Sequence, residues 1–408
     1  MHKIECLLQT LAPKGVEFRK LGEVINILKG KQLNKELLLD YGEYPVMNGG
    51  IHASGYWNEY NTDYPKIIIS QGGASAGYVN YMTSKFWAGA HCYAIELNSE
   101  KLNYKFLYYF LKNSQIILMK SQFGAGIPAL NKADIETLLI PIPPLEIQQE
   151  IVKILDAFTE LNTELNTELK ARKKQYAYYQ NMLLDFKDIN SNHKDAKEKL
   201  AQKTYPKRLK SLLQTLAPKG VEFRKLGEVL EYDQPNKYCV TSKEFDKSYP
   251  TPVLTAGKTF ILGYTNEKDN IYQASKSSPV IIFDDFTTAT QWVDFPFKVK
   301  SSAMKILLPK NPTINIRFIF FYMQTIPYNI SGEHTRQWIS RYSQITIPIP
   351  PLEIQQEIVK ILDQFSILTT DLLAGIPAEI EARKKQYEYY REKLLSFKPL
   401  TPHKEVKK

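Results

Sequence analysis

Residues 140–156 read IPIPPLEIQQEIVKILD, and residues 347–363 repeat the same letters without a change. A second identical block, LLQTLAPKGVEFRKLGEV, occupies residues 7–24 and returns at residues 212–229. Because self-similarity over such a long period is the signature of a repeated structural unit, the chain is built from two copies of one plan.

Two segments of similar length, 25–139 and 230–346, lie between these blocks and differ almost completely in sequence. They keep only a skeleton of matched positions: YPVMNGG at 44–50 against TPVLTAG at 251–257, and apolar runs at 67–69 and 280–283. A shared frame with different contents predicts two domains that recognise two different targets. The alternative is a duplication in which one copy decayed, but decay should have eroded the frame as well.

A long helix is predicted after Pro143 and Pro144, because proline is tolerated at a helix start and Glu146 suits the positive end of the helix dipole. Apolar residues then recur in steps of four and three, which is the spacing of a coiled-coil seam. The seam is the same in both copies: Ile147, Ile151, Ile154, Phe158, Leu161 and Leu165, then Ile354, Ile358, Ile361, Phe365, Leu368 and Leu372.

The two helical arms should differ in continuity. The first should run from about 145 to 187, whereas Gly375 and Pro377 should kink or interrupt the second. Each seam needs an apolar partner, and the nearest is the other copy, which favours an antiparallel pair with one globular domain near each end. Two separate helices, each packed on its own domain, are the alternative.

These patterns predict an α+β fold: two globular mixed α/β domains separated by a long antiparallel two-helix coiled coil, with a pseudo-twofold internal repeat. The expected boundaries are a first reading domain at 1–144, a first scaffold helix and basic linker at 145–210, a second reading domain at 211–350, and a second scaffold helix and tail at 351–408.

The composition is that of an ordinary globular protein, with 43% hydrophobic and 24% charged residues among 408, enough for at least two cores. No apolar run of about 18 residues and no secretory signal occurs, so we expect a cytoplasmic protein without a membrane span. The three cysteines have no disulfide or zinc spacing. The net charge of +10 suggests an anionic partner, and most of the excess lies in residues 170–210.

Inside the first arm, the tetrapeptide Thr-Glu-Leu-Asn occurs at 159–162 and 163–166 and begins again at Thr167. Four helical residues add about 6 Å, close to the rise of two base pairs at about 3.4 Å each. One hypothesis is that the repeat number sets the distance between the two reading domains. Ordinary heptad filler is the alternative.

The sequence lacks the common catalytic sets, including the Asn-Pro-Pro-aromatic run of amino-methyltransferases and the His-Glu-x-x-His metal helix. Asp284-Asp285 could hold a divalent ion in a nuclease, but the first copy has Gln71-Gly72 there, which favours a structural loop. His91 is interpreted as a packed core histidine, with DNA contact as the alternative. We expect no catalytic residue, no metal site and no cofactor.

Polar and glycine-rich turns between the predicted strands supply the candidate DNA contacts. Asn and Gln pair bidentately with adenine, Arg and Lys with guanine, and Ser and Thr with several base edges. An ordinary turn or surface role is the alternative for each. The basic triplets at 172–174 and 383–385 are interpreted as the solvated face of a helix, with phosphate contact as the alternative. The candidates are Lys31, Gln32, Asn48, Gln71, Ser75, Lys258, Thr287, Thr288, Gln291, Arg336, Gln337 and Trp338.

A variable domain that ends in IPIPPLEIQQEI and leads into a long helix, all of it occurring twice, resembles the specificity subunit of Type I restriction-modification systems. The likeness covers nearly the whole chain, and the Thr-Glu-Leu-Asn tetrads resemble the central repeat of some family members. The resemblance implies two target recognition domains that each read one half of a split, asymmetric DNA site.

The resemblance also implies partners. Family members have no activity alone and assemble on double-stranded DNA with two modification subunits, which methylate adenine, and with restriction subunits, which translocate and cleave DNA. The helical arms would dock the modification subunits. The expected function is therefore non-catalytic DNA recognition. A stand-alone enzyme, such as a nuclease fused to a recognition domain, and a helical assembly scaffold without nucleic acid are the alternatives.

Overall fold

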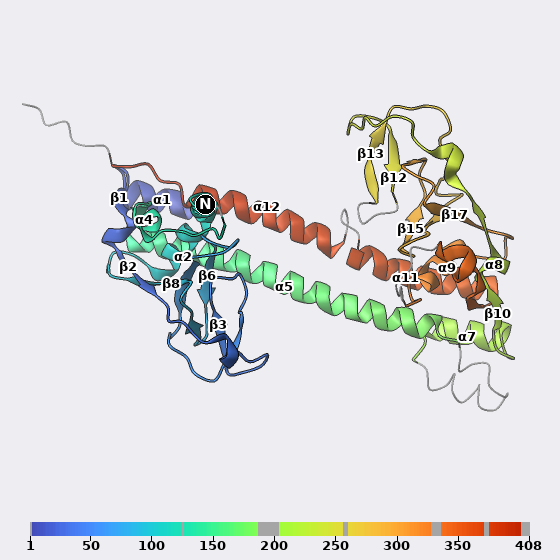
Figure 1. Cartoon of the computed structure of the whole chain (residues 1–408), viewed down its shortest axis with the longest axis horizontal. Helices are drawn as coiled ribbons and strands as arrows, with labels where there is room; N and C mark the ends of the chain where they lie inside the picture. The colour runs from blue at the N-terminus through green and yellow to red at the C-terminus, as the bar shows by residue number, and fades with distance from the viewer. Residues whose placement is uncertain are drawn as a thin grey trace, which may run out of the picture. The chain divides into compact units, whose positions relative to one another are not determined.

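The computed structural model describes residues 2–124, 126–186, 204–255, 260–327, 336–370 and 375–400 (Figure 1). The chain forms two compact units: unit 1 is Met1–Asn166 with Glu379–Lys408, and unit 2 is Thr167–Ala378. Each unit therefore contains one reading domain and parts of both arms. Lys258, Leu372 and most of the basic linker lie outside the described residues.

Unit 1 builds its reading domain from the first copy of the plan. Its helices are α1 (His2–Leu11), α2 (Tyr104–Asn113), α3 (Gln115–Lys120) and α4 (Lys132–Glu136). Its strands are β1 (Glu17–Lys20), β2 (Ile25–Lys29), β3 (Tyr44–Met47), β4 (Gly55–Trp57), β5 (Lys66–Ser70), β6 (Val79–Met82), β7 (Trp87–Ala88), β8 (Cys92–Leu97) and β9 (Leu139–Ile142).

Unit 2 builds the second reading domain. Its helices are α7 (Lys207–Leu216), α8 (Leu226–Val229), α9 (Ile316–Met323) and α10 (Gln337–Ser340). Its strands are β10 (Glu222–Lys225), β11 (Leu230–Asp233), β12 (Thr251–Leu254), β13 (Ile261–Thr265), β14 (Val280–Asp284), β15 (Thr290–Val293), β16 (Lys298–Val299), β17 (Met304–Pro309) and β18 (Thr346–Ile349).

The two domains have the same sheet topology despite their different sequences. A four-stranded antiparallel sheet has the order β2-β8-β5-β6 in unit 1 and β11-β17-β14-β15 in unit 2. Three-stranded sheets, β4-β3-β7 and β13-β12-β16, each contain one parallel pair, and β1-β9 and β10-β18 form two-stranded ribbons. The matched segments 44–47 and 251–254 become β3 and β12, the central strands of these three-stranded sheets.

The arms are α5 (Leu145–Leu184), α11 (Leu352–Thr370) and α12 (Ile376–Leu394). The first arm is one continuous helix, while the second is two helices separated next to Gly375, which confirms the predicted interruption (Figure 1). In unit 1 the Phe158 ring lies 5.6 Å from that of Tyr390, and in unit 2 the Tyr179 ring lies 5.0 Å from that of Phe365. Positions later in α5 thus meet positions earlier in the second arm, so the arms pair antiparallel and each finds its partner in the other copy.

The buried face of each arm differs from the expected seam at one step, and in the second arm the prediction for Leu368 was also wrong, because this residue is 37% exposed near the end of α11. Leu155 and Leu362 are fully buried, whereas Ile154 and Ile361 are only partly buried at the edge of the same cores. Ile151 and Leu155 are four residues apart and both face the globular domain. This spacing follows the ordinary helical period of about 3.6 residues and not the coiled-coil period of about 3.5. The Phe158 ring instead contacts the rings of Tyr387 and Tyr390 in the other arm. One helix therefore carries two apolar stripes with different partners.

The second arm also completes the first reading domain. Leu394 and Leu395 belong to the unit 1 core. The Val16 amide donates to the Lys398 carbonyl at 2.9 Å, and the Leu400 amide donates to the Val16 carbonyl at 3.0 Å. Gly15 has φ +106°, and a Cβ there would lie 2.7 Å from the Pro399 carbonyl oxygen, so this close approach requires glycine.

Replacing Leu155 with Ala should lower the free energy of unfolding of the full chain by about 2–5 kcal/mol, because the side chain is fully buried. Urea titration measures this change. Ile154→Ala is the matched control and should cost clearly less. Equal losses from the two variants would contradict the assignment of the buried face.

Candidate DNA-reading loops

Three loops of the first reading domain are joined at the backbone of His91. The Asn48 side-chain oxygen accepts a hydrogen bond from the His91 amide at 3.1 Å, and the Gln71 amide donates to the His91 carbonyl at 2.9 Å. The Ser70 hydroxyl donates to the Gly49 carbonyl. The loops that carry the candidates Asn48 and Gln71 are therefore bonded together, and Ser75 lies in the same loop as Gln71.

Glycines allow this close packing of loops. A Cβ on Gly89 would lie 2.5 Å from the Asn48 side-chain oxygen, and a Cβ on Gly30 would lie 2.1 Å from the Gly89 carbonyl oxygen. Next to Gly30, the Lys31 amide donates to the Ala88 carbonyl at 2.8 Å. The Lys31 side chain is exposed. Lys31 thus belongs to the same loop cluster.

Two other residues of the first domain, Gln32 and His91, are both exposed. Gln32 is exposed, and its side-chain amide donates to the Leu33 carbonyl at 3.0 Å. His91 is exposed, so the interpretation of a packed core histidine was wrong. The apolar neighbours that suggested a core position belong to β8, which begins one residue later. No sequence pattern indicated that the His91 backbone connects two candidate loops.

In the second domain, Asp284 and Asp285 organise the corresponding loops. The Asp284 carboxylate accepts hydrogen bonds from the amides of Phe286 and Thr287, at 2.9 and 3.1 Å, and from the Thr287 hydroxyl. The Asp285 carboxylate accepts from the Trp338 amide at 2.9 Å. The turn that carries Thr287 and Thr288 is therefore fixed to the segment that begins at Arg336.

The remaining candidates of the second domain divide between surface and core. Thr287, Gln291 and Arg336 are exposed. Gln337 and Trp338 are each 2% exposed, and the Trp338 ring packs on Phe283 at 5.3 Å. Their side chains lie in the domain interior because α10 packs against the end of β14. Among the described candidates of this domain, the burial of Gln337 and Trp338 leaves Thr287, Thr288, Gln291 and Arg336, and the prediction for Lys258 is not tested.

The two loop systems share a frame and differ in content. The Gln71 carbonyl accepts from the Leu130 amide at 2.8 Å, as the Asp285 carbonyl accepts from the Gln337 amide at 2.8 Å. The loop after β5 closes with a bond from the Gly77 amide to the Ser70 carbonyl. The loop after β14 closes earlier, from the Thr288 amide to the Asp284 carbonyl. Both closing residues have positive φ, +88° and +59°. The frame is constant while the length of the exposed loop changes.

The aspartate pair has a structural role. Asp285 and Lys305 form a buried ion pair at 3.7 Å, each side chain 2% exposed. Burial lowers the pKa of Lys305, and the charge of Asp285 acts in the opposite direction. Within the described residues, no group of three or more His, Cys, Asp or Glu side chains is placed to hold a metal ion.

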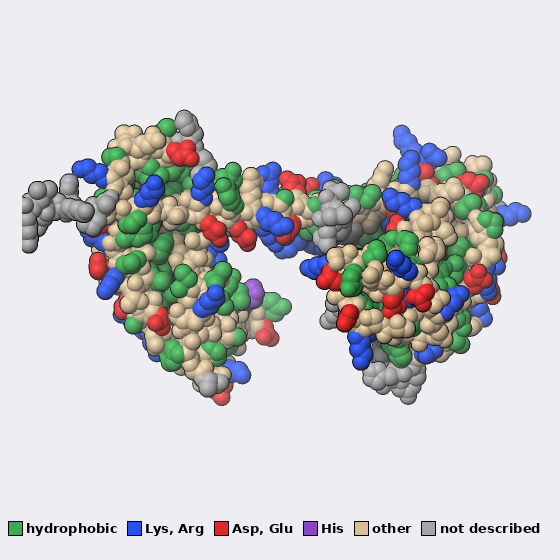
Figure 2. Space-filling model, turned by 90° about the horizontal axis from the view of Figure 1, so that it is seen from above, with side chains coloured by type: hydrophobic (Ala, Val, Ile, Leu, Met, Phe, Trp, Pro, Cys, Tyr) green, Lys and Arg blue, Asp and Glu red, His purple; other side chains and the backbone are tan. Residues whose placement is uncertain are grey.

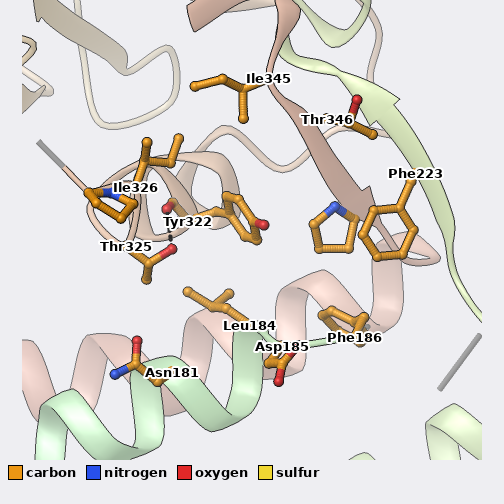
Figure 3. Close-up of a pocket in the computed structure, with 12 residues that line it drawn as sticks. Asn181, Leu184, Asp185, Phe186, Phe223, Tyr322, Thr325, Ile326, Ile345 and Thr346 are labelled. Carbon is orange, nitrogen blue, oxygen red and sulfur yellow. Dashed lines mark hydrogen bonds between the residues drawn. The ribbon is translucent and has the colours of Figure 1, made fainter. Parts of the chain in front are cut away.

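A pocket of about 500 Å³ in unit 2 lies at the end of α5, apart from these loops (Figure 3). Leu184, Phe186, Phe223 and Tyr322 contribute to its lining, which among the described residues includes Asp185 but no lysine or arginine. Elsewhere, Figure 2 shows Lys and Arg side chains interspersed with acidic ones on the visible face of each unit.

The comparison with known families identifies the chain. A model of the Type I restriction modification DNA specificity domain matches residues 13–175 and again residues 218–382. The chain belongs to this family. Its members are the specificity subunits of Type I restriction-modification complexes, which bind DNA and have no catalytic activity of their own. Membership supports the DNA-recognition interpretation over a stand-alone enzyme and over a scaffold without nucleic acid.

Individual relatives agree. The chain is 31% identical over 405 residues to a putative type I restriction enzyme specificity subunit of Haemophilus influenzae, covering 94% of this chain and 96% of that protein. It is 55% identical over 188 residues to the EcoR124I/EcoR124II specificity subunit of Escherichia coli; that match spans 44% of this chain and 45% of the relative. The crystal structure of an M. genitalium S subunit has the same fold, with a TM-score of 0.67, 20% identity, and coverage of 96% and 98% of the two chains. Among the described residues, no helix has the length and apolar character to cross a membrane.

Asp285→Ala should destabilise the protein by about 3–5 kcal/mol, because it leaves the buried Lys305 ammonium without its carboxylate. Thermal or urea unfolding tests this. The pair Lys85–Asp63 has the same 3.7 Å separation but lies at the surface, so Asp63→Ala should change stability little. A small effect of Asp285→Ala would contradict a structural role for the pair.

Proposed function

We propose that this chain recognises a bipartite, asymmetric DNA site, with residues 1–144 reading one half and residues 211–350 reading the other. The observation that carries this proposal is the pair of loop systems built on one frame with different polar residues, half-buried in the first domain and exposed in the second. Identical loops would read identical half-sites, whereas these offer Asn48 and Gln71 in one domain and Thr287 and Arg336 in the other.

The charge distribution supports a function that needs partners. Phosphate contacts supply much of the affinity of DNA-binding proteins, yet the two reading segments carry little net charge. We propose that two modification subunits join the chain, close around the DNA and add phosphate contacts, and that restriction subunits join the same complex. The methyl transfer would then occur on the modification subunits, and this chain would only select the site.

Side-chain substitutions should separate the two halves of the site. With a modification subunit present, Lys31→Ala should weaken recognition of one half and Arg336→Ala recognition of the other, by about 1–3 kcal/mol for each bidentate hydrogen-bonded pair with a base. Binding to DNA duplexes altered in one half at a time measures this. The exposed Lys14, far along the sequence from the loops, provides a control in Lys14→Ala. Equal weakening at both halves by each variant would contradict the assignment.

The tetrapeptide repeat lies wholly within the continuous helix α5. Its hydroxyls and amides bond back along the helix, as the Thr163 hydroxyl does to the Thr159 carbonyl at 2.9 Å. We propose that this repeat sets the spacing between the half-sites.

Deleting residues 163–166 should shorten the helix by about 6 Å and reduce the recognised spacing by about two base pairs. Methylation of duplexes with graded spacers measures the change. Substituting the same four residues with alanines keeps the helix length and should leave the spacing unaltered. An unchanged spacing after the deletion would contradict the proposal that the repeat sets the spacing between the half-sites.

A further inference from the structure

One buried amide in each arm is held by the same set of main-chain groups. The Gln148 oxygen accepts from the Asn103 amide at 2.7 Å, and its nitrogen donates to the carbonyls of Lys101 and Pro143, at 2.8 and 2.6 Å. The Gln355 oxygen accepts from the Asn315 amide at 2.8 Å, and its nitrogen donates to the carbonyls of Thr313 and Pro350, at 3.1 and 2.7 Å. Both glutamines are essentially inaccessible to solvent.

The partners place each glutamine at the start of one helix of the reading domain. Asn103 and Asn315 are the N-caps of α2 and α9, and each side chain accepts from two amides in the first turn of its helix. The arm glutamine thus binds the backbone of the capping residue itself. Because only main-chain atoms are contacted, Lys101 and Thr313 can differ in type and still supply the same carbonyl.

A second attachment lies two helical turns further along each arm. The Asp156 carboxylate pairs with Lys105 of α2 at 2.8 Å, and the Asp363 carboxylate pairs with Arg317 of α9 through two guanidinium nitrogens, at 2.9 and 2.8 Å. Eight residues, about 12 Å of helix, separate the glutamine from the aspartate. Two separated attachments hold the reading-domain helix against rotation as well as translation.

The same helices are connected to the reading loops. In unit 1, Lys112 of α2 donates to the carbonyl of Val79 at 2.7 Å, immediately after the loop that carries Gln71 and Ser75. In unit 2, Arg317 of α9 stacks on Trp292 of β15 at 4.6 Å, and β15 follows the turn that carries Thr287. A continuous series of contacts thus leads from arm to helix to loop.

We propose that Gln148 and Gln355, supported by Asp156 and Asp363, are positioning residues for DNA recognition: they fix the orientation at which each reading domain presents its loops, without contacting DNA. This inference rests on the proposed function. The glutamine amide that hydrogen-bonds the backbone at a buried helix start also fixes the orientation of the reading domain on its arm. Removing these hydrogen bonds in one arm should therefore alter the orientation of one domain and leave that of the other unchanged.

Gln148→Met and Gln355→Met test this in the full chain with a modification subunit, because methionine keeps the side-chain length but removes all three hydrogen bonds. Gln148→Met should reduce discrimination about tenfold at the half-site read by residues 1–144 only, and Gln355→Met at the other half-site only. The adjacent exposed residues provide matched controls, Gln149→Met and Gln356→Met, which should discriminate like the unaltered chain.

The outcomes separate the inference from the function. Weaker binding at both half-sites alike, or undiminished discrimination in both variants, overturns the positioning role while bipartite recognition stands. If the unaltered complex shows no bipartite preference, the proposed function falls and the inference falls with it. Loss of discrimination at one half-site, with urea unfolding showing that both units are still folded under the binding conditions, supports the positioning role; loss that follows unfolding of the altered unit overturns it.

Discussion

A buried amide that can be satisfied only by backbone groups is the constraint on which the two-copy architecture depends. Leaving the polar atoms of Gln148 or Gln355 without partners inside a core would cost several hydrogen bonds, so each domain must offer a helix start at one fixed place. That requirement fixes where the backbone of the reading domain lies and places little restriction on the side chains of the domain. It explains how the block IPPLEIQQEI can stay identical while the segments beside it differ almost completely.

The same constraint explains why the frame of the reading domains is shared although their loops are not. Carbonyls and amides at the ends of β5 and β14 make equivalent bonds, and only the loop between them changes in length and content. Where positions of the attachment vary, the contact is kept: a carbonyl comes from Lys101 or Thr313, and a cation from Lys105 or Arg317. A specificity subunit needs this separation, since altering what is read must leave the assembly intact.

The sequence predicted the features that depend on local pattern. The identical sequence blocks indicated the duplication, and the spacing of apolar residues indicated the helical arms. Gly375 and Pro377 indicated the interruption of the second arm. What escaped prediction depends on interactions between residues distant in sequence. Leu155 is buried because the arm faces a domain as well as a helix, and Trp338 because Asp285 draws α10 onto β14. In the pair Gln148-Gln149 the letters are identical, and only the register of the helix decides which one is buried.

Unit 2 is one uninterrupted stretch of chain, whereas unit 1 is assembled from two stretches that flank it. During vectorial synthesis, the ribosome therefore delivers the residues of unit 2 before residues 398–400, which bond to the backbone of Val16, have emerged. The domain whose residues are made first is the last to close its core. Nascent chains should thus expose apolar surface around Phe106, whose ring lies 6.4 Å from that of Phe397 in the folded unit, until Phe397 has emerged, and a chaperone that binds such surfaces would find it there.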